Sequence, residues 1–227
     1  MAAGMVITID GPAGAGKSTV SRLLAERLGF HYLDTGAMYR AVALAALREK
    51  LLGDSEQLAR RLESLQLAIK DGKVSLNGRE VDNQELRTVE VTAASSLVAS
   101  QSAVREWLVR MQKEIGQSGN YVTEGRDQGT VVFPDAICKF FLTADPGERA
   151  RRRLAEMQKG GTANLPSLAE LEAGIIERDQ RDCNRATGPL RAAGDAILVD
   201  TTTLSQHLVV DRLENEVRRK LAGVGAQ

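Results

Sequence analysis

The sequence predicts an α/β fold in which five short, mostly parallel strands form a core sheet with helices on both faces. Three observations lead to it. A glycine-rich loop near the N-terminus joins a β-branched strand, residues 6–9, to a helical pattern that begins at Ser18. Short apolar runs then alternate with amphipathic helical patterns, which is typical of parallel sheets. The length of 227 residues suits one domain with a smaller insert.

The glycine-rich loop fits the phosphate-binding pattern G-x-x-x-x-G-K-[ST]. Its residues are Gly11, Pro12, Ala13, Gly14, Ala15, Gly16, Lys17 and Ser18, followed by Thr19. Glycines let consecutive N–H groups point at one anion, and the N-terminus of the next helix adds partial positive charge. Lys17 can reach the β- and γ-phosphates of a nucleoside triphosphate, and the Ser18 hydroxyl can ligate Mg²⁺. Since a strand and a helix flank the loop, a turn without a ligand is the weaker interpretation, and we expect residues 11–19 to bind a nucleoside triphosphate.

Composition excludes several other classes of protein. Lys and Arg number 30, as do Asp and Glu, and this balance argues against a general role on nucleic acids or membrane surfaces. Cys138 and Cys183 form neither a disulfide framework nor a zinc pattern, and His31 and His207 are isolated. No apolar run approaches membrane length, and no signal peptide is recognisable, so we expect a soluble cytoplasmic protein.

A second strand at residues 31–33 ends at a polar cluster. Asp34, Thr35 and Arg40 follow it and lead into a helix through residue 47. Ligands of parallel α/β sheets bind outside the carboxyl ends of strands, which favours a functional cluster. A helix cap at Thr35 with a surface arginine fits the spacing equally well.

An antiparallel insert follows a helix predicted at residues 58–65. Apolar residues alternate between Leu67 and Val81, and Asp71-Gly72 and Asn77-Gly78 are strong hairpin signals. The insert carries no catalytic residue types, so we interpret it as a substrate-covering flap or a packing unit.

Two helices are expected next, at residues 85–99 and 103–115, with Trp107 in the core. A third strand, residues 121–123, then runs into Glu124-Gly125-Arg126-Asp127-Gln128-Gly129-Thr130. Opposite charges gathered at a strand end are costly without a polyanion or a metal to contact, and this favours a functional site.

The C-terminal third predicts an arginine-rich lid between two strands, residues 138–142 and 197–200. One helix begins at Asp145-Pro146 and carries Arg149 and Arg151–Arg153. A flexible break at Gly160, Gly161, Asn164 and Pro166 separates it from a helix that begins near Leu168. Within the second helix Arg178, Arg181, Asp182 and Arg185 would share one face. Such guanidiniums can close over phosphates, although a solvated face is the commoner explanation. Ser205 can cap a last helix that runs to about Leu221.

The other motifs decide among P-loop classes. Switch GTPases need D-x-x-G after a strand and N-K-x-D for guanine, and neither occurs in a suitable place. Motor ATPases usually show an apolar strand that ends in Asp-Glu, which no strand here does. A short P-loop chain with two further charged strand ends and a lid indicates a small-molecule kinase, which holds two polyanions in line and excludes water.

The chain also resembles the bacterial cytidylate kinases, a family of nucleoside monophosphate kinases, from about residue 5 to residue 221. Four blocks carry the resemblance: Ile7–Lys17, Leu33–Arg40, Glu124–Ala136 and Glu177–Arg185. The antiparallel insert is typical of the family, in which it enlarges the monophosphate-binding region. The resemblance implies that ATP, with Mg²⁺, phosphorylates CMP or dCMP, and that the protein is a monomer.

The resemblance further implies roles for single residues. Ser96, Arg105 and Asp182 would face the cytosine. Asp182 and Thr35 would lie near the sugar hydroxyls. Arg40, Arg126 and Arg185 would hold the monophosphate. The transferred phosphoryl group would meet Arg178, Arg181 and the 151–153 region on lid closure, and Asp127 would lie near the nucleotides. The expected catalytic residues are thus Lys17, Arg126, Asp127, Arg178 and Arg181.

The expected organisation is one kinase domain over residues 1–227. Its core would span 5–60, 100–150 and 190–222, with the monophosphate-binding insert at about 61–99 and the lid at about 151–182. Three positions depart from the family pattern, since Thr35 stands where Ser is common, Glu124 where Asp is common, and Ser18 where Gly can occur. The alternatives are a P-loop kinase for UMP, AMP or a small acid, and a nucleotide-sensing module that transfers nothing.

Overall fold

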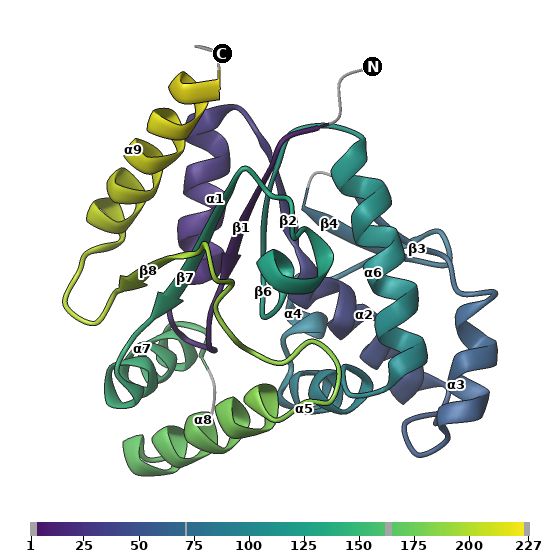
Figure 1. Cartoon of the computed structure of the whole chain (residues 1–227). Coiled ribbons are helices and arrows are strands. Elements are labelled where there is room, and N and C mark those ends of the chain that lie inside the picture. The colour runs from purple at the N-terminus through teal and green to yellow at the C-terminus, as the bar shows by residue number, and fades with distance from the viewer. Residues whose placement is uncertain (1–3, 71, 162–164, 225–227) are drawn as a thin grey trace.

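The computed structural model describes residues 4–70, 72–161 and 165–224. Its core is a five-stranded sheet of order β2–β6–β1–β7–β8, in which every neighbouring pair is parallel (Figure 1). The strands are β1 Val6–Asp10, β2 His31–Asp34, β6 Tyr121–Gly125, β7 Cys138–Thr143 and β8 Ile197–Asp200. All five residues of β1 are buried, as expected of the central strand of a covered parallel sheet. The predicted core of five parallel strands is confirmed.

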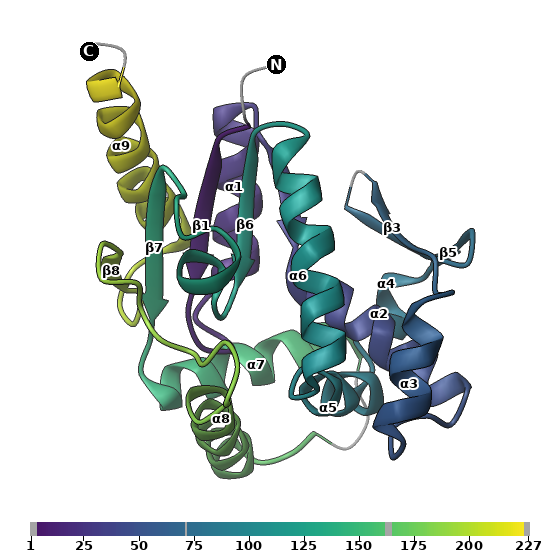
Figure 2. The ribbon, with the colours of Figure 1, turned by 45° about the vertical axis from the view of Figure 1, so that its right-hand side comes forward.

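Helices cover both faces of this sheet. They are α1 Lys17–Leu28, α2 Thr35–Arg48, α3 Ser55–Leu62, α4 Asn83–Leu86, α5 Val89–Val98, α6 Ser102–Gln117, α7 Pro146–Lys159, α8 Leu168–Cys183 and α9 Gln206–Val224, with a π-helical turn, η1, at Gln128–Val132. Figure 2 shows α1 and α9 behind the sheet, and η1 and α6 in front of it. One hydrophobic cluster joins α1 and α9 to the sheet, and a second surrounds α2.

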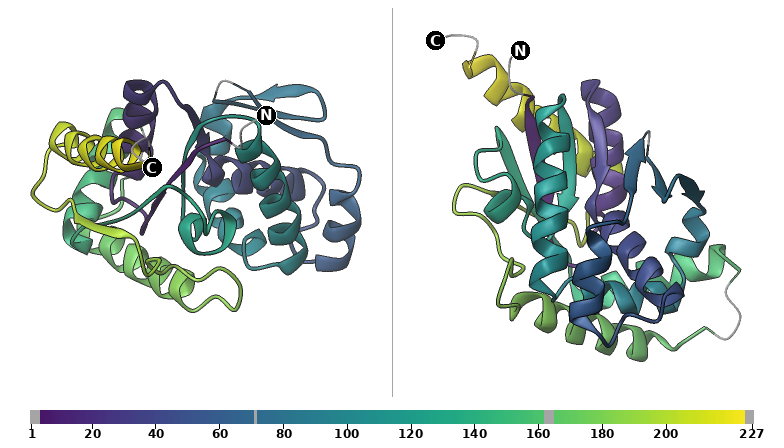
Figure 3. Two further views of the ribbon diagram at one scale, coloured as in Figure 1. Left: turned by 45° about the horizontal axis from the view of Figure 1, so that its top comes forward. Right: turned by 90° about the vertical axis from the view of Figure 1, so that its right-hand side faces the viewer.

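The predicted antiparallel insert is confirmed as a three-stranded sheet, β3 Leu67–Lys70, β4 Lys73–Leu76 and β5 Arg79–Val81. Asn77 and Gly78 both have positive φ, as a tight hairpin turn requires. The other predicted turn includes Asp71, which lies outside the described residues. Figure 3 shows this sheet beside α2, separate from the core sheet.

Two helix predictions differ from the structure. The single helix expected at residues 85–99 is two helices, α4 and α5, because the Thr88 hydroxyl accepts a hydrogen bond from Val91 N–H (3.3 Å) and starts a new helix. Helix α3 begins at Ser55, earlier than expected, since the Asp54 carboxylate caps it. Trp107 is only partly buried, at the margin of the α2 cluster.

Helices α7 and α8 pack side by side below the sheet in Figure 1. Asp145 caps α7 ahead of Pro146, and Ser167 with Glu170 forms a capping box on α8. Of the predicted flexible break, Asn164 lies outside the described residues. No helix in the described part of the chain is long and apolar enough to cross a membrane.

The end of β1 imposes a strict steric limit at Gly11. Its φ is 146°, which other residues rarely adopt, and an added Cβ would overlap the Leu142 carbonyl oxygen on β7. Only glycine therefore lets the chain leave the sheet edge at this point.

We expect Gly11→Ala to lower the free energy of unfolding by about 3 kcal/mol, because backbone strain and overlap with β7 add together. Gly194→Ala is the matched control, since Gly194 has open space around its Cβ position and no positive φ. Urea denaturation measures both variants. Equal stabilities would show that the contact with β7 can relax.

Candidate active site

Three polar loops converge at one edge of the sheet, at the carboxyl ends of β1, β2 and β6. The P-loop follows β1, Asp34 and Thr35 lie at the end of β2, and Arg126 and Asp127 follow β6. Parallel pairing of β1 with β6 and of β2 with β6 brings these ends together. This is the edge at which α/β sheets bind ligands.

The P-loop has the backbone of an anion site. Gly11, Gly14 and Gly16 all have positive φ, and Gly16 precedes α1 without any side-chain cap. The first N–H groups of α1 thus face the loop without a capping side chain. Side chains from elsewhere fix its carbonyls, because Arg149 Nη1 donates to Ala13 O (3.1 Å) and Thr201 Oγ1 to Ala15 O (3.1 Å).

Lys17 is buried and turned back on its own loop, where Nζ donates to Pro12 O (2.7 Å). Burial and then the charges of Arg126 and Arg178, against the opposite effect of Glu124 and Asp10, lower the pKa of Lys17 to about 7. An anion placed in the loop would restore the charged form of Lys17.

Glu124 is a buried carboxylate beside the loop. Burial and then the charge of Asp34 raise the pKa of Glu124, while Tyr32 donates its hydroxyl hydrogen to Glu124 Oε1. The exposed Ser18 hydroxyl lies next to the same carboxylate. These hard oxygens suit Mg²⁺. Among the described residues, no group of three or more His, Cys, Asp or Glu side chains is placed to hold a metal ion.

An arginine cluster, defined here as Arg40, Arg126, Arg178 and Arg185, faces Lys17. Its carboxylate partners are Asp34, which pairs with Arg40 at 3.1 Å, and Asp182, which pairs with Arg126 at 2.9 Å and with Arg185. Burial and then Arg126 lower the pKa of Arg178 to about 10.

Four guanidiniums therefore meet only two carboxylates in this arginine cluster. The buried Nε atoms of Arg40 and Arg178 have no hydrogen-bond partner within the described part of the chain. Such an excess of desolvated donors is matched by a bound polyanion.

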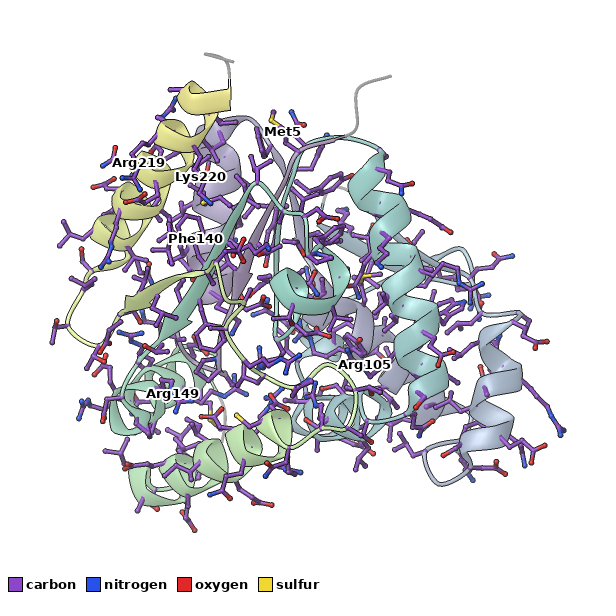
Figure 4. All side chains as sticks on the ribbon, in the orientation of Figure 1. Met5, Arg105, Phe140, Arg149, Arg219 and Lys220 are labelled. Atoms are coloured by element: carbon purple, nitrogen blue, oxygen red, sulfur yellow. The ribbon has the colours of Figure 1, made fainter. Side chains whose placement is uncertain are left out.

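Arg105 and Asp127 form a buried ion pair next to the arginine cluster. Tyr39 Oη lies 3.4 Å from Arg105 Nη1. A Cβ on Gly188 would overlap both charged side chains, so the loop after α8 covers the pair. Figure 4 shows Arg105 and Arg149 on opposite sides of the lower end of the sheet.

The remaining predicted site residues come from α2, α5, α8 and the loop after α8. Arg181 is exposed and contacts Glu177 at 3.9 Å, outside the arginine cluster. Arg185 lies beyond α8, which ends at Cys183, so the predicted shared helix face does not exist. Thr35 Oγ1 donates to Glu124 O (2.6 Å), and it is Asp34, not Thr35, that caps α2. Ser96 is half-buried on α5.

Sequence reasoning assigned no role to Tyr32 or Thr201 and counted Arg149 among the lid arginines, not as a support of the P-loop, because the partners of all three are distant in sequence. Asp10 carried a detectable signal, since it is a charged residue that ends a fully buried strand.

Comparison with known proteins gives consistent matches. The cytidylate kinase family profile matches residues 7–219. A cytidylate kinase of Geobacter sulfurreducens is 44% identical over 222 residues, which are 96% of this chain and 94% of that protein. One from Solibacter usitatus is 46% identical over 218 residues, which are 96% and 94% of the two chains.

A bifunctional pantoate ligase/cytidylate kinase of Synechococcus sp. (strain JA-3-3Ab) is 48% identical over 229 residues, and the match covers 97% of this chain and 42% of that protein. Among solved structures, an uncharacterized protein from Eubacterium ventriosum has a TM-score of 0.51 at 12% identity, with 94% and 98% of the chains covered. That likeness supports the fold alone.

Inorganic phosphate is expected to raise the Tm of the protein with increasing concentration, because it supplies the charge that the arginine cluster lacks. At about 100 times its Kd the gain is roughly 2.7 kcal/mol. Arg178→Gln should lose most of this shift and melt higher without phosphate, since it removes a half-buried charge whose buried Nε has no hydrogen-bond partner among the described residues.

Arg219→Gln is the matched control, because Arg219 is an exposed arginine on α9. Differential scanning fluorimetry with chloride at the same ionic strength separates binding from screening. A full phosphate shift in Arg178→Gln would contradict the proposed anion site.

Proposed function

The chain belongs to the cytidylate kinase family, and on that basis we propose that it transfers the γ-phosphate of ATP to CMP or dCMP, giving ADP and CDP or dCDP. The bond from the γ-phosphorus to the β,γ-bridging oxygen breaks. A bond from that phosphorus to a phosphate oxygen of CMP forms. The reaction needs positioning and charge stabilisation and no covalent intermediate with the enzyme.

One observation carries this proposal: Lys17 of the P-loop lies close enough to Arg126 and Arg178 for both to lower its pKa. Two anion sites therefore adjoin, one at the loop and one at the arginine cluster. A kinase needs this arrangement, since donor and acceptor phosphates must approach in line against their mutual repulsion.

On the donor side, the P-loop N–H groups and Lys17 would hold the β- and γ-phosphates. Lys17 would exchange its present acceptor, Pro12 O, for phosphate oxygens. Ser18 and Glu124 would hold Mg²⁺, which neutralises charge on the transferred group when it is bound.

On the acceptor side, Arg40, Arg126 and Arg185 would bind the monophosphate, and Arg178 would contact the transferred phosphoryl group. The support is chemical, because guanidiniums offer paired donors to phosphate and Arg178 Nε is buried without a partner. Asp127 would act through Arg105, its ion-pair partner.

Cytosine recognition would fall to Asp182, Arg105 and Ser96, with Thr35 and Asp182 near the sugar. Burial acts to raise the pKa of Asp182, but Arg126 and Arg185 outweigh it and hold this pKa below its usual value. Asp182 is then an acceptor only, which suits the exocyclic amine of cytosine and disfavours the carbonyl of uracil.

Residues 151–182 would form the lid and residues 61–99 the monophosphate-binding insert. Arg181, exposed in this structure, would reach the phosphates only after α8 moves toward the P-loop. A cytoplasmic location and a monomeric state remain predictions from the sequence.

The function is tested by ADP release from ATP and Mg²⁺ with CMP, dCMP, UMP, AMP and shikimate supplied separately. We expect strong turnover with CMP and dCMP and little with the others. A preference for another acceptor would support the kinase activity but contradict the assignment of Asp182, Arg105 and Ser96 to cytosine recognition. ATP binding without transfer to any acceptor would indicate a nucleotide-sensing module.

Asp182→Asn is expected to reduce the ratio of kcat/KM for CMP to that for UMP by roughly tenfold or more, because an amide can donate to uracil where the carboxylate cannot. Asp211→Asn is the control, since Asp211 also pairs with an arginine but lies on α9. An unchanged ratio in Asp182→Asn would remove Asp182 from base recognition.

A further inference from the structure

We propose that Asp10 is a positioning residue for the acceptor side of the reaction, because its carboxylate caps η1 and leaves the Asp127 carboxylate free to pair with Arg105. This inference rests on the proposed function. It concerns a residue directly before the P-loop, where a role in ATP binding would be the ordinary expectation.

Both oxygens of the Asp10 carboxylate are occupied by the η1 turn. Oδ1 accepts from Gln128 N–H at 2.8 Å, and Oδ2 accepts from Gly129 N–H at 2.7 Å. These are the first two amides of η1, which a helix start leaves without partners. Each oxygen of Asp10 thus accepts one main-chain hydrogen bond, and the pair of bonds fixes the turn against the end of β1.

Asp127 stands at the N-cap position of η1, where an Asp side chain ordinarily bonds the turn. Here its side chain makes no capping hydrogen bond and pairs with Arg105 instead. Asp10 performs the capping from a strand that is distant in sequence, and Asp127 keeps its charge for the site.

The sheet register explains how Asp10 reaches the turn. Asp10 lies opposite Gly125 at the end of the β1–β6 pair, and the chain folds back over it within three residues. A Cβ on Gly129 would lie 2.9 Å from Thr8 Oγ1 and 3.4 Å from Asp10 Oδ2, so glycine allows this close approach. Register and glycine therefore place the two amides on one buried carboxylate.

The turn is held from its other side by Gln128, whose side chain is buried. Gln128 Oε1 accepts from Thr123 Oγ1 (2.9 Å), and Nε2 donates to Gln112 Oε1 (3.0 Å). The Asp10 carboxylate thus fixes the main chain of Gln128, and Gln112 and Thr123 fix its side chain. Loss of either support should displace Asp127.

The ionisation of Asp10 agrees with this role. Burial raises the pKa of Asp10 to about 6, and the Gly129 and Gln128 amides oppose the rise. At neutral pH the carboxylate is ionised and accepts two charge-assisted hydrogen bonds, which are stronger than neutral ones.

The test is Asp10→Asn, which keeps the shape but replaces one acceptor oxygen with an NH₂ group facing an amide. We expect the KM for CMP to rise roughly tenfold or more, while the Kd for ATP, measured by calorimetry, stays within about threefold. A merely structural role would weaken both nucleotides alike. An equal loss of ATP binding would overturn the proposal.

Thr8→Val is the matched control. Thr8 lies on the same strand, and its buried Oγ1 has no partner among the described residues, so its loss should alter neither constant. Gln112→Leu is the substitute test variant if Asp10→Asn does not fold. It removes the side-chain support for Gln128, and we expect the same split between KM for CMP and Kd for ATP.

Amide hydrogen exchange at Gln128 and Gly129 tests the capping without any substrate. Asp10→Asn should speed exchange at these amides more than in β7. If wild-type protein does not phosphorylate CMP, the proposed function fails, and faster exchange at these amides still supports capping by Asp10. Unchanged exchange, or an unchanged KM in an active enzyme, overturns the inference itself.

Discussion

The site depends on one electrostatic constraint, which is positive charge held at a sheet edge with too little negative charge beside it. Lys17 and the arginine cluster face one another with Asp34 and Asp182 as the paired carboxylates of that cluster. Such an arrangement costs free energy in the empty protein and returns it when phosphates bind. In the proposed reaction, the groups that repel one another in the empty protein are those that would neutralise the transferred phosphoryl group.

The fold tolerates this repulsion between like charges because it holds the charged groups on rigid elements. Central strand β1 is buried on both faces, and its pairing with β6 sets the P-loop beside the Arg126 loop. The arginines proposed to contact substrate come from separate elements, since Arg40 lies on α2, Arg105 on α6 and Arg178 on α8.

Features that depend on local sequence patterns could be predicted from the sequence. The P-loop, the five strands and the antiparallel insert follow from periodicity and turn residues, and membership of the family follows from its motifs, while the roles of the site residues stay predictions. Two kinds of feature could not be predicted, which are helix boundaries set by single local bonds and contacts between residues distant in sequence. Helix α5 starts anew at Thr88 because of one capping bond, Arg185 falls beyond the end of α8, and the role of Asp10 exists only once β1 pairs with β6. Arg105 was expected to face a base, and no local pattern indicated its ion pair with Asp127.

The Arg149 side chain on α7 connects α8 with the P-loop and the end of β7. Its guanidinium bonds Ala13 O in the P-loop and Ala144 O at the end of β7, and pairs with Asp179 on α8 at 2.6 Å. Asp179 is therefore the counter-ion of a buried arginine that supports the phosphate loop. Grafting a shorter segment in place of α8 alone would leave that arginine, which lies on α7, buried and uncompensated. In this protein α8 is therefore not an independent module, because its Asp179 is part of the support under the phosphate loop.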